Sequence, residues 1–382
     1  MIMRIAVEAL GIHYVGGGRS ATLNLLEALF QIDQQNQYLV ILTAPEHTLS
    51  GFDNVTQLIA PVRNRLLVRI WAQLRLPRIV QSYDLIHFVK NLSVFGISIP
   101  RIVTVYDLTT LVYPQIFPTV DVLYWRHVQP LALRRADVII AISAETANDL
   151  RRFFPVPDEK IRVIYPGYAR VFTPPSLATT AAVLRKYNLP NEFVLQVGRL
   201  DRKKNLAVLI QAYAMLKREF GFGGKLVLVG EEYQKMRDRD VHRAIRDARL
   251  EADVIQTGAV PLEDLPALYG GATLAVYLSM HEGFGIVAVE AMACGAPLIA
   301  SRTGAIPEAA GDAAVYVDAA VDPGRLAAEM WRVVSSEQIR AQMRAAGFRQ
   351  AARFSNERCA LDTLLLYNEV AKQSRSEMVR TG

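Results

Sequence analysis

Short apolar runs alternate with longer amphipathic segments along the whole chain. Runs rich in strand-forming residues lie at 4–9, 38–43, 84–89, 101–106, 137–143 and 161–165, and again at 193–198, 225–230, 253–258, 272–279 and 297–301. Helical patterns fill the intervals, for example over 144–154, and the pattern beyond Asp322 is helical nearly to the end. Because strands that alternate with helices form parallel sheets covered on both faces, the pattern predicts an α/β protein.

Two such alternations in series predict two domains. A chain of 382 residues is too long for one core of ordinary size. The segment 165–180, which is rich in proline and threonine, separates the two halves and is expected to be the linker. The fold class expected is therefore two doubly wound, Rossmann-like domains whose carboxyl strand edges face each other across a cleft, where a substrate would bind.

Composition excludes several classes of protein. Hydrophobic residues make up 51% and charged residues 21%, which is typical of a globular protein. The chain has no apolar run of about 18 residues, and its first apolar segment is too short for a signal peptide. The two cysteines indicate no disulfide framework, and no Cys/His cluster has the spacing of metal ligands. A cytoplasmic protein without a metal site is expected.

The net charge of +6 is confined to the first half. Residues 1–190 carry 19 Lys and Arg against 13 Asp and Glu, whereas residues 191–382 carry 24 of each. The densest segment is 63–78, in which Leu67, Ile70, Trp71 and Leu74 follow helical spacing. Such a helix either lies on an anionic membrane or packs its apolar stripe into the core. No motif predicts nucleic-acid binding. The five arginines of this segment are Arg63, Arg65, Arg69, Arg75 and Arg78.

The stretch SMHEGFGIVAVEAMACGAPLIAS, residues 279–301, predicts a turn, a helix and a strand after a buried strand. Glu282 lies on the turn, and Glu290 lies about one turn into the helix. In open α/β sheets ligands bind at this edge, where helix N-terminal N–H groups attract phosphate and a carboxylate can accept hydrogen bonds from hydroxyls. The alternative is a capping carboxylate and a solvent-facing helix residue.

Two further turns carry candidate phosphate ligands. In VGRLDRKKN, residues 197–205, four basic side chains crowd a strand-to-helix turn, and arginine there can clamp a diphosphate. In YVGGGRSA, residues 14–21, three glycines follow the first strand and would let the backbone approach a phosphate. A solvated loop and a tight turn are the respective alternatives.

Taken together, these motifs resemble the retaining nucleotide-sugar glycosyltransferases of family 4, which have the GT-B fold and include bacterial mannosyl- and glucosyltransferases. The resemblance covers nearly the whole chain. It rests on the glycine loop, on TVYDL, ADVIIAIS, IRVIYPGY and VGRLDRKKN, and most specifically on HEGFGIVAVEAMACGAP with its paired glutamates. It implies an acceptor-binding domain at 1–170, a donor-binding domain at 171–355, and a C-terminal helix at 356–382 that returns to the first domain.

The resemblance also implies a role for each matching residue. Glu290 would hold the ribose of the donor, and Glu282 would bind the sugar hydroxyls and stabilise charge. Arg199 and Lys204 would clamp the diphosphate, which is why the family needs no divalent metal. Backbone groups would complete the donor site, with Gly283, Phe284 and Gly285 at the sugar and diphosphate, Gly17 and Gly18 at the diphosphate, and Gly258 to Val260 against the base.

Catalysis would pass through an oxocarbenium-like state with retention of configuration, and no second carboxylate is positioned as a nucleophile. Tyr106-Asp107 departs from the family pattern, since many members have His-Asp there. A tyrosine keeps the backbone carbonyl but is a poor base at neutral pH. Two alternatives follow: Tyr106 binds a sugar hydroxyl instead, or it marks an altered site.

The leading hypothesis is an enzyme that moves a hexose from a nucleotide sugar, GDP-mannose or alternatively UDP-glucose, to a saccharide or lipid-linked acceptor in polysaccharide or glycolipid synthesis. No separate cofactor is expected. The rival hypothesis is a catalytically altered nucleotide-sugar-binding protein. A basic first domain further suggests a peripheral position at the inner face of the membrane.

Overall fold

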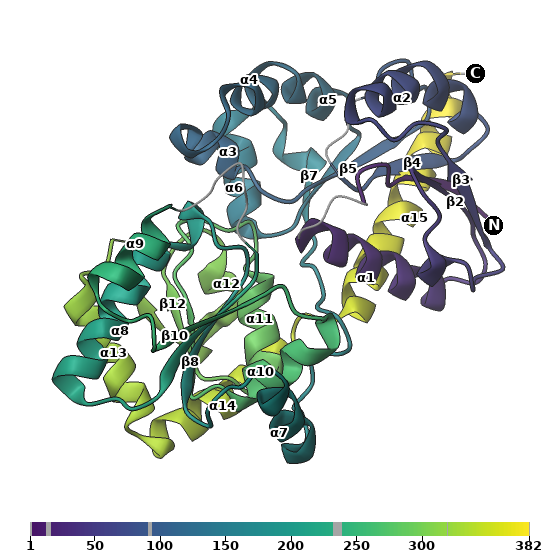
Figure 1. Ribbon diagram of the computed structural model, residues 1–382. Helices are drawn as coiled ribbons and strands as arrows, with labels where there is room; N and C mark the ends of the chain where they lie inside the picture. The colour runs from purple at the N-terminus through teal and green to yellow at the C-terminus, as the bar shows by residue number, and fades with distance from the viewer. Residues whose placement is uncertain (1, 13–16, 91–93, 232–238, 319, 382) are drawn as a thin grey trace. The chain divides into compact units, whose positions relative to one another are not determined.

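The computed structural model describes residues 2–12, 17–90, 94–231, 239–318 and 320–381 (Figure 1). The chain divides into two compact units. Unit 1 comprises Met1–Gly167 together with Ser355–Gly382, and unit 2 comprises Tyr168–Phe354. Each unit has its own parallel sheet and its own hydrophobic core.

Unit 1 contains a seven-stranded parallel sheet in the order β3-β2-β1-β4-β5-β6-β7. Successive strands are added on one side of β1 up to β3 and on its other side from β4 onward, so the switch point of the unit lies between β1 and β4. Its strands are β1 (Arg4–Glu8), β2 (Gln37–Leu42), β3 (Val55–Ile59), β4 (Leu85–Phe88), β5 (Arg101–Val105), β6 (Val138–Ala141) and β7 (Ile161–Val163).

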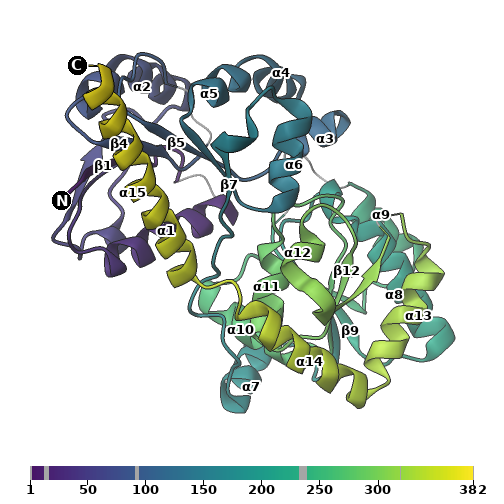
Figure 2. The same ribbon diagram turned by 180° about the vertical axis from the view of Figure 1, so that it is seen from behind.

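Helices cover both faces of this sheet. One face packs against α1 and the long C-terminal helix α15, which lie side by side in Figure 2. The other face packs against α2 and α6. The return of the C-terminal helix to the first unit is thus observed. The helices are α1 (Gly17–Ile32), α2 (Arg65–Val80), α3 (Thr109–Val112), α4 (Thr119–His127), α5 (Gln129–Arg135), α6 (Ala144–Phe153) and α15 (Asn356–Thr381).

Unit 2 contains a six-stranded parallel sheet in the order β10-β9-β8-β11-β12-β13, with its switch point between β8 and β11. The strands are β8 (Phe193–Val197), β9 (Lys225–Val229), β10 (Val254–Gly258), β11 (Leu274–Tyr277), β12 (Leu298–Ser301) and β13 (Ala314–Val317). The helices are α7 (Leu177–Lys186), α8 (Leu206–Phe220), α9 (Arg239–Asp247), α10 (Leu265–Gly271), α11 (Ile286–Ala293), α12 (Ile306–Ala310), α13 (Pro323–Val334) and α14 (Glu337–Ala351).

The expected fold class, two Rossmann-like units with parallel sheets, is confirmed. Two strands were missed, β3 and β13, and both lie at sheet edges, where half-exposed side chains interrupt the apolar run that marks a central strand. The expected linker was also too long, because Ser176 caps α7 by accepting a hydrogen bond from the backbone N–H of Thr179. The last four residues of the expected linker, 177–180, are therefore helical.

Candidate functional site

The turns after β8 and β11 lie next to the switch point of unit 2. Gly198 directly follows β8 with a φ of +133°, and Gly230 directly follows β9 with a φ of +134°. A side chain on Gly230 would lie 2.1 Å from the carbonyl oxygen of Gly198, so the backbones of the two turns are in direct contact. This packing holds the basic turn Arg202–Lys204 at the carboxyl edge of the sheet.

Three charged side chains meet above this edge. Nζ of Lys204 lies 2.7 Å from Oε1 of Glu282, and Nζ of Lys203 lies 3.3 Å from Oε2 of the same carboxylate. Lys204 also donates to Tyr277 at 3.2 Å, and its ammonium lies 4.6 Å from the centre of the Tyr277 ring. The hydroxyl of Ser279 donates to Oε1 of Glu282. The sequence analysis counted Lys203 among the basic side chains of this turn but gave it no individual role, and it did not name Ser279 as a site residue.

The electrostatics of Glu282 follow from these contacts. Burial alone would raise its pKa, but the ammonium groups of Lys203 and Lys204 outweigh burial and hold the pKa well below the usual range. Glu282 is therefore an ionised, immobilised carboxylate at neutral pH. Such a group can accept hydrogen bonds from hydroxyls and stabilise nearby positive charge, but it is not a proton donor.

Backbone hydrogen bonds fix the turn that carries Glu282. The N–H of Met280 donates to the carbonyl of Lys203 at 2.8 Å, which joins the two turns. The N–H of Ala305 donates to the carbonyl of Glu282 at 3.0 Å. Gly304, with a φ of +51°, lies so close that a side chain there would meet the backbone of Glu282 at 2.7 Å. The position of the carboxylate is thus set by three loops of the same unit.

Glu290 lies in α11, where the sequence placed it, but its environment differs from that of Glu282. No hydrogen bond to its carboxylate comes from the described residues. Burial therefore raises its pKa to about 8, while its charge acts on the buried groups Tyr269 and Cys294. Glu290 is half-buried, which differs from the freely solvent-facing residue of the alternative interpretation. A half-buried carboxyl group with no hydrogen bond from the described residues can accept hydrogen bonds from a ligand that brings hydroxyl donors.

The residues between the two glutamates would contribute backbone groups, and not side chains, to the candidate site. Gly285 precedes α11 in the left-handed region, with a φ of +96°. The side chain of Phe284 is buried and packs on Phe354, with ring centres 5.0 Å apart, so it points into the unit. Gly258 ends β10 with a φ of +70°, and Val260 follows it in the half-exposed loop. A backbone role for Gly283, Phe284 and Gly285 is compatible with this arrangement.

Arg199 lies on the same turn as the two lysines and is half exposed. Its Nη2 atom lies 3.5 Å from Oδ2 of Asp201. Asp201 is buried and caps the turn by accepting a hydrogen bond from the N–H of Lys203. Burial raises the pKa of Asp201, against the opposing effect of Lys204, Arg199 and Lys203. The sequence analysis missed Asp201, although Asp at the start of a helical turn is a recognised capping signal.

In unit 1 the structure describes most of the expected residues. Gly17 begins α1 and Gly18 follows it, whereas Gly16 lies outside the described residues. The hydroxyl of Tyr106 lies 2.7 Å from that of Thr22 on α1, and burial raises the pKa of Tyr106. Asp107 accepts a hydrogen bond from the N–H of Thr109 at 3.1 Å. The Tyr106 hydroxyl is thus held by a neighbouring helix.

Other polar residues at the carboxyl edge of the unit 1 sheet were not expected. Glu8 ends β1 and is buried, which raises its pKa to about 7 although the N–H of Leu10 donates to it. Lys90, just after β4, donates to the carbonyl of Gly11 at 3.1 Å. The sequence contained a signal for Glu8, because a charged residue at the end of an apolar first strand is a candidate site residue.

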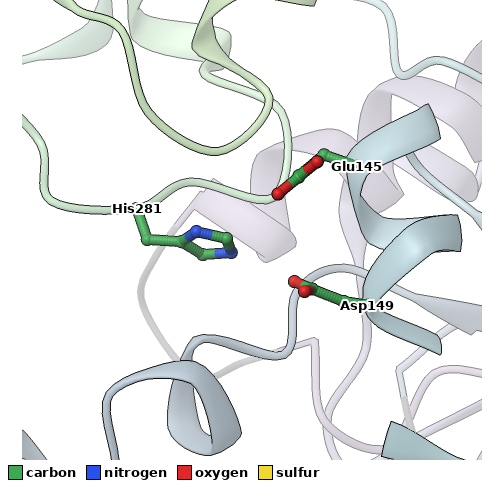
Figure 3. Close-up of side chains that lie close together, drawn as sticks. All are labelled: Glu145, Asp149 and His281. Atoms are coloured by element: carbon green, nitrogen blue, oxygen red, sulfur yellow. The ribbon is translucent and has the colours of Figure 1, made fainter. Parts of the chain in front are cut away.

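Figure 3 shows Glu145 and Asp149 projecting from successive turns of α6 in unit 1, and His281 on the loop after β11 in unit 2. The helix α6 follows β6, so both carboxylates lie toward the carboxyl edge of their own sheet. The side chain of His281 is buried, and His281 directly precedes Glu282 in the sequence. Each unit therefore presents ionisable side chains at the edge where ligands bind in parallel sheets.

The comparisons with known proteins agree with this geometry. The Glycosyltransferase Family 4 model matches residues 15–170, and the model of Glycosyl transferases group 1 matches residues 184–350. The O-antigen chain mannosyltransferase B of Escherichia coli is 30% identical over 70% of this chain and 69% of its own length. The D-inositol 3-phosphate glycosyltransferase of Thermobifida fusca is 31% identical over 63% of this chain and 57% of its own length. The serotype-specific mannosyltransferase WbdA of Escherichia coli is 29% identical, but the match spans only 27% of WbdA.

Solved structures extend the likeness over the whole fold. The crystal structure of Anabaena HepE in complex with UDP and glucose superposes with a TM-score of 0.78 at 20% identity, covering 96% of this chain and 100% of that one. WaaG, a glycosyltransferase involved in lipopolysaccharide biosynthesis, gives 0.74 at 14% identity, covering 94% and 98%. Two Rossmann-like units of this kind define the GT-B class. Within that class, the chain belongs to the glycosyltransferases with a family 4 first domain and a group 1 second domain.

Proposed function

We propose that this glycosyltransferase transfers mannose from GDP-mannose to a saccharide or lipid-linked acceptor, with retention of anomeric configuration and without a divalent metal. The observation that carries the proposal is the cluster of Lys203, Lys204 and Glu282 beside the switch point of unit 2. It supports the proposal because fixed positive charge would stabilise a diphosphate leaving group as its negative charge grows, and fixed negative charge would stabilise a glycosyl cation.

Each residue has a part in this mechanism. Lys204 and Arg199 bind the diphosphate and stabilise it as the bond to the sugar breaks, and the lysines supply the charge that a metal supplies elsewhere. Glu282 accepts hydrogen bonds from the sugar hydroxyls and stabilises the oxocarbenium-like state. Glu290 takes hydrogen bonds from the ribose, which gives its half-buried carboxylate the partners that it lacks among the described residues.

Ion pairing in the ligand-free unit also bears on donor binding. Lys204 is engaged with Glu282 at 2.7 Å, so a diphosphate must share this ammonium or displace the carboxylate from it. Displacement of Lys204 would leave Oε1 of Glu282 available to the sugar hydroxyls, while backbone hydrogen bonds still hold the turn that carries this residue. The proposed roles of Gly17, Gly18, Tyr106 and Asp107 at the diphosphate and acceptor, and of Gly258 to Val260 against the base, complete this proposal.

The choice of mannose rests on relatives of which two carry mannosyltransferase names, both from Escherichia coli. UDP-glucose is the second candidate donor, because a solved structural neighbour is in complex with UDP-glucose. The proposed setting, polysaccharide or glycolipid assembly, is suggested by the name of the O-antigen relative. The described residues include no helix that is long and apolar enough to cross a bilayer.

The proposal is tested by thermal shift against a panel of nucleotide sugars and free nucleotides, with wild type and Glu290→Ala compared. A ligand that binds only the folded state at 100 times its Kd adds about 2.7 kcal/mol, which moves the midpoint by several degrees. A shift with GDP-mannose that is lost in Glu290→Ala is expected, followed by NMR of the product anomer to determine retention. A shift with UDP-glucose alone would make UDP-glucose, and not GDP-mannose, the proposed donor. No shift with any donor would favour a catalytically altered binding protein.

A further inference from the structure

Helix α2 carries two apolar faces. Val68, Ala72, Leu76 and Val80 are buried and pack into the unit 1 core. Leu66, Leu67, Ile70 and Leu74 lie on the outside, where Leu66 is 66% and Leu74 is 65% exposed. The alternative in which Leu67, Ile70 and Leu74 pack into the core is therefore wrong, although Trp71 does pack against the core. An outward apolar stripe on a helix without acidic residues has no structural role within the fold.

The exposed apolar surface continues beyond this helix. The N–H of Phe95 donates to Oε1 of Gln73 on α2, and the guanidinium of Arg135 lies 4.8 Å from the Phe95 ring centre. The guanidinium of Arg69 lies 4.5 Å from the ring centre of Tyr124 on α4. These contacts join α2, α4 and α5 into one surface, and Figures 1 and 2 both show the three helices along one side of unit 1. We call it the α2–α4–α5 surface.

Side chains of two kinds make up the α2–α4–α5 surface. Half of the exposed large hydrophobic side chains described in the whole chain lie on it: Leu66, Leu67, Ile70, Leu74, Phe95, Val120, Leu123, Val128 and Leu131. The same segments, with the residues just before α2, contain eight arginines and one acid, Asp121. So many exposed aliphatic side chains on neighbouring helices are rare on a protein that has no partner for them.

We propose that the α2–α4–α5 surface docks on an anionic lipid bilayer, with its aliphatic side chains inserted at the headgroup boundary and its arginines around them on the phosphates. Inserting leucine, isoleucine and valine removes apolar area from water, and each arginine near an anionic surface adds electrostatic attraction. A second copy of the chain would bring the same positive charge against it, and nucleic acid would leave the aliphatic side chains without stacking partners. The bilayer satisfies both components.

This inference deepens the proposed function, because a membrane-docked enzyme meets a lipid-linked acceptor at the surface where that acceptor resides. Vesicle binding requires neither donor nor catalysis, however. The two proposals can therefore fail separately: thermal shift with nucleotide sugars reports on the donor site, and vesicle binding reports on this surface.

The test is co-sedimentation of the full chain with vesicles of phosphatidylcholine alone or vesicles rich in phosphatidylglycerol. Wild type is expected to bind the anionic vesicles at low salt, and binding is expected to weaken as salt screens the arginines. The variant Leu67→Ser/Leu74→Ser/Arg75→Glu/Arg78→Glu changes outward-facing side chains, so it is expected to fold. It should lose at least about tenfold in apparent affinity, since four contacts of this kind together exceed 1.4 kcal/mol. The matched control Leu177→Ser/Arg185→Glu, on α7 of unit 2, should bind like wild type.

Thermal shift with nucleotides should be unchanged in the quadruple variant, which shows that its donor site is intact. Failure of wild type to sediment with anionic vesicles would overturn the inference, as would equal binding by the quadruple variant. Binding to phosphatidylcholine with no gain from phosphatidylglycerol would overturn the part played by the arginines. A dimer in analytical ultracentrifugation that the quadruple variant converts to a monomer would instead assign the surface to self-association.

Discussion

The carboxylate of Glu282 and the ammonium of Lys204 form an ion pair at 2.7 Å, and both side chains are shielded from solvent at the carboxyl edge of the unit 2 sheet. The pair is not an isolated surface bridge. Lys203 approaches the second oxygen, Ser279 donates to the first, and Tyr277 lies under the lysine. Removing one member therefore leaves a buried charge with fewer partners, which costs far more than the loss of an exposed pair.

Lys204→Ala is expected to lower transfer activity by about 10²–10³ in kcat, because it removes the ammonium that is best placed to stabilise the leaving diphosphate. Lys203→Ala provides the matched comparison. It removes a neighbouring cation that lies 3.3 Å rather than 2.7 Å from the Glu282 carboxylate. Because this ion pair is longer, a smaller loss in kcat of about tenfold is expected. Steady-state kinetics and donor titration by calorimetry measure both. A loss in Lys203→Ala as large as in Lys204→Ala would contradict the assignment.

Glu290 should make the ligand-free protein less stable as pH rises. Burial raises its pKa to about 8 from an ordinary value of 4.5, so the folded chain holds a proton that the unfolded chain has released. Stability is therefore highest below pH 4.5 for this group and declines up to about pH 8, by at most about 1.4 kcal/mol per pH unit. Glu290→Gln removes the ionisable group and therefore this loss of stability at high pH.

The difference in Tm between Glu290→Gln and wild type is expected to be near zero at pH 5 and to grow to several degrees at pH 8 in favour of the variant. Differential scanning calorimetry across this range measures it. Glu263→Gln, an exposed change in the same unit, serves as the control and should follow the wild-type curve. Parallel curves for Glu290→Gln and wild type would show that the carboxylate is solvated rather than buried.

The parts of this fold that the sequence predicts are those set by local pattern. Central strands such as β6 and β11 are continuous apolar runs because they are buried on both faces, and α11 with its flanking glycines follows directly from its signals. Glu282 and Lys204 were found because motif and turn coincide. The partners of these residues were not predicted, because Ser279 and Tyr277 resemble ordinary strand residues in the sequence. Only the folded sheet shows that they contact Lys204 and Glu282.

Contacts between residues that are far apart in the sequence also could not be predicted. Tyr106 and Thr22 are 84 positions apart, and His87 and Tyr367 are 280 positions apart, so no periodicity relates them. The two apolar faces of α2 show the same limit, because spacing indicates that residues share a face but not which face meets the core. Only the packing of Val68 and Leu76 into the sheet shows that Leu67 and Leu74 point outward.

Gly230→Ala is expected to destabilise unit 2 by several kcal/mol. A Cβ at this position would lie 2.1 Å from the carbonyl oxygen of Gly198, and the φ of +134° is strained for any side chain. The basic turn that begins at Gly198 must then shift, so donor affinity should fall together with stability. Gly223→Ala is the matched control, because no atom lies within 4 Å of its Cβ position. Urea unfolding and donor titration measure both effects; equal stability of the two variants would contradict the close packing of β8 and β9.

A buried histidine holds the C-terminal helix on unit 1. His87 on β4 lies 2.6 Å, through Nδ1, from the hydroxyl of Tyr367 on α15, and 2.7 Å, through Nε2, from the hydroxyl of Thr104 on β5. Burial lowers the pKa of His87 to about 3, so the folded chain keeps this imidazole neutral. The unfolded chain binds a proton below about pH 6.5, and unit 1 therefore loses stability as pH falls below that value, by about 2 kcal/mol at pH 5.

Tyr367→Phe leaves Nδ1 of His87 without its partner and is expected to cost about 1–3 kcal/mol at pH 7.5, because a buried polar group loses its hydrogen bond. His87→Gln should cost stability at pH 7.5 but flatten the decline between pH 6.5 and pH 5, since the titrating group is gone. Urea unfolding at both pH values measures these changes, and hydrogen exchange along α15 reports whether the helix loosens first. His127→Gln on the exposed surface of α4 is the control and should leave the pH dependence unchanged. A wild-type protein equally stable at pH 7.5 and pH 5, with His87→Gln indistinguishable from it, would show that this histidine does not anchor the helix.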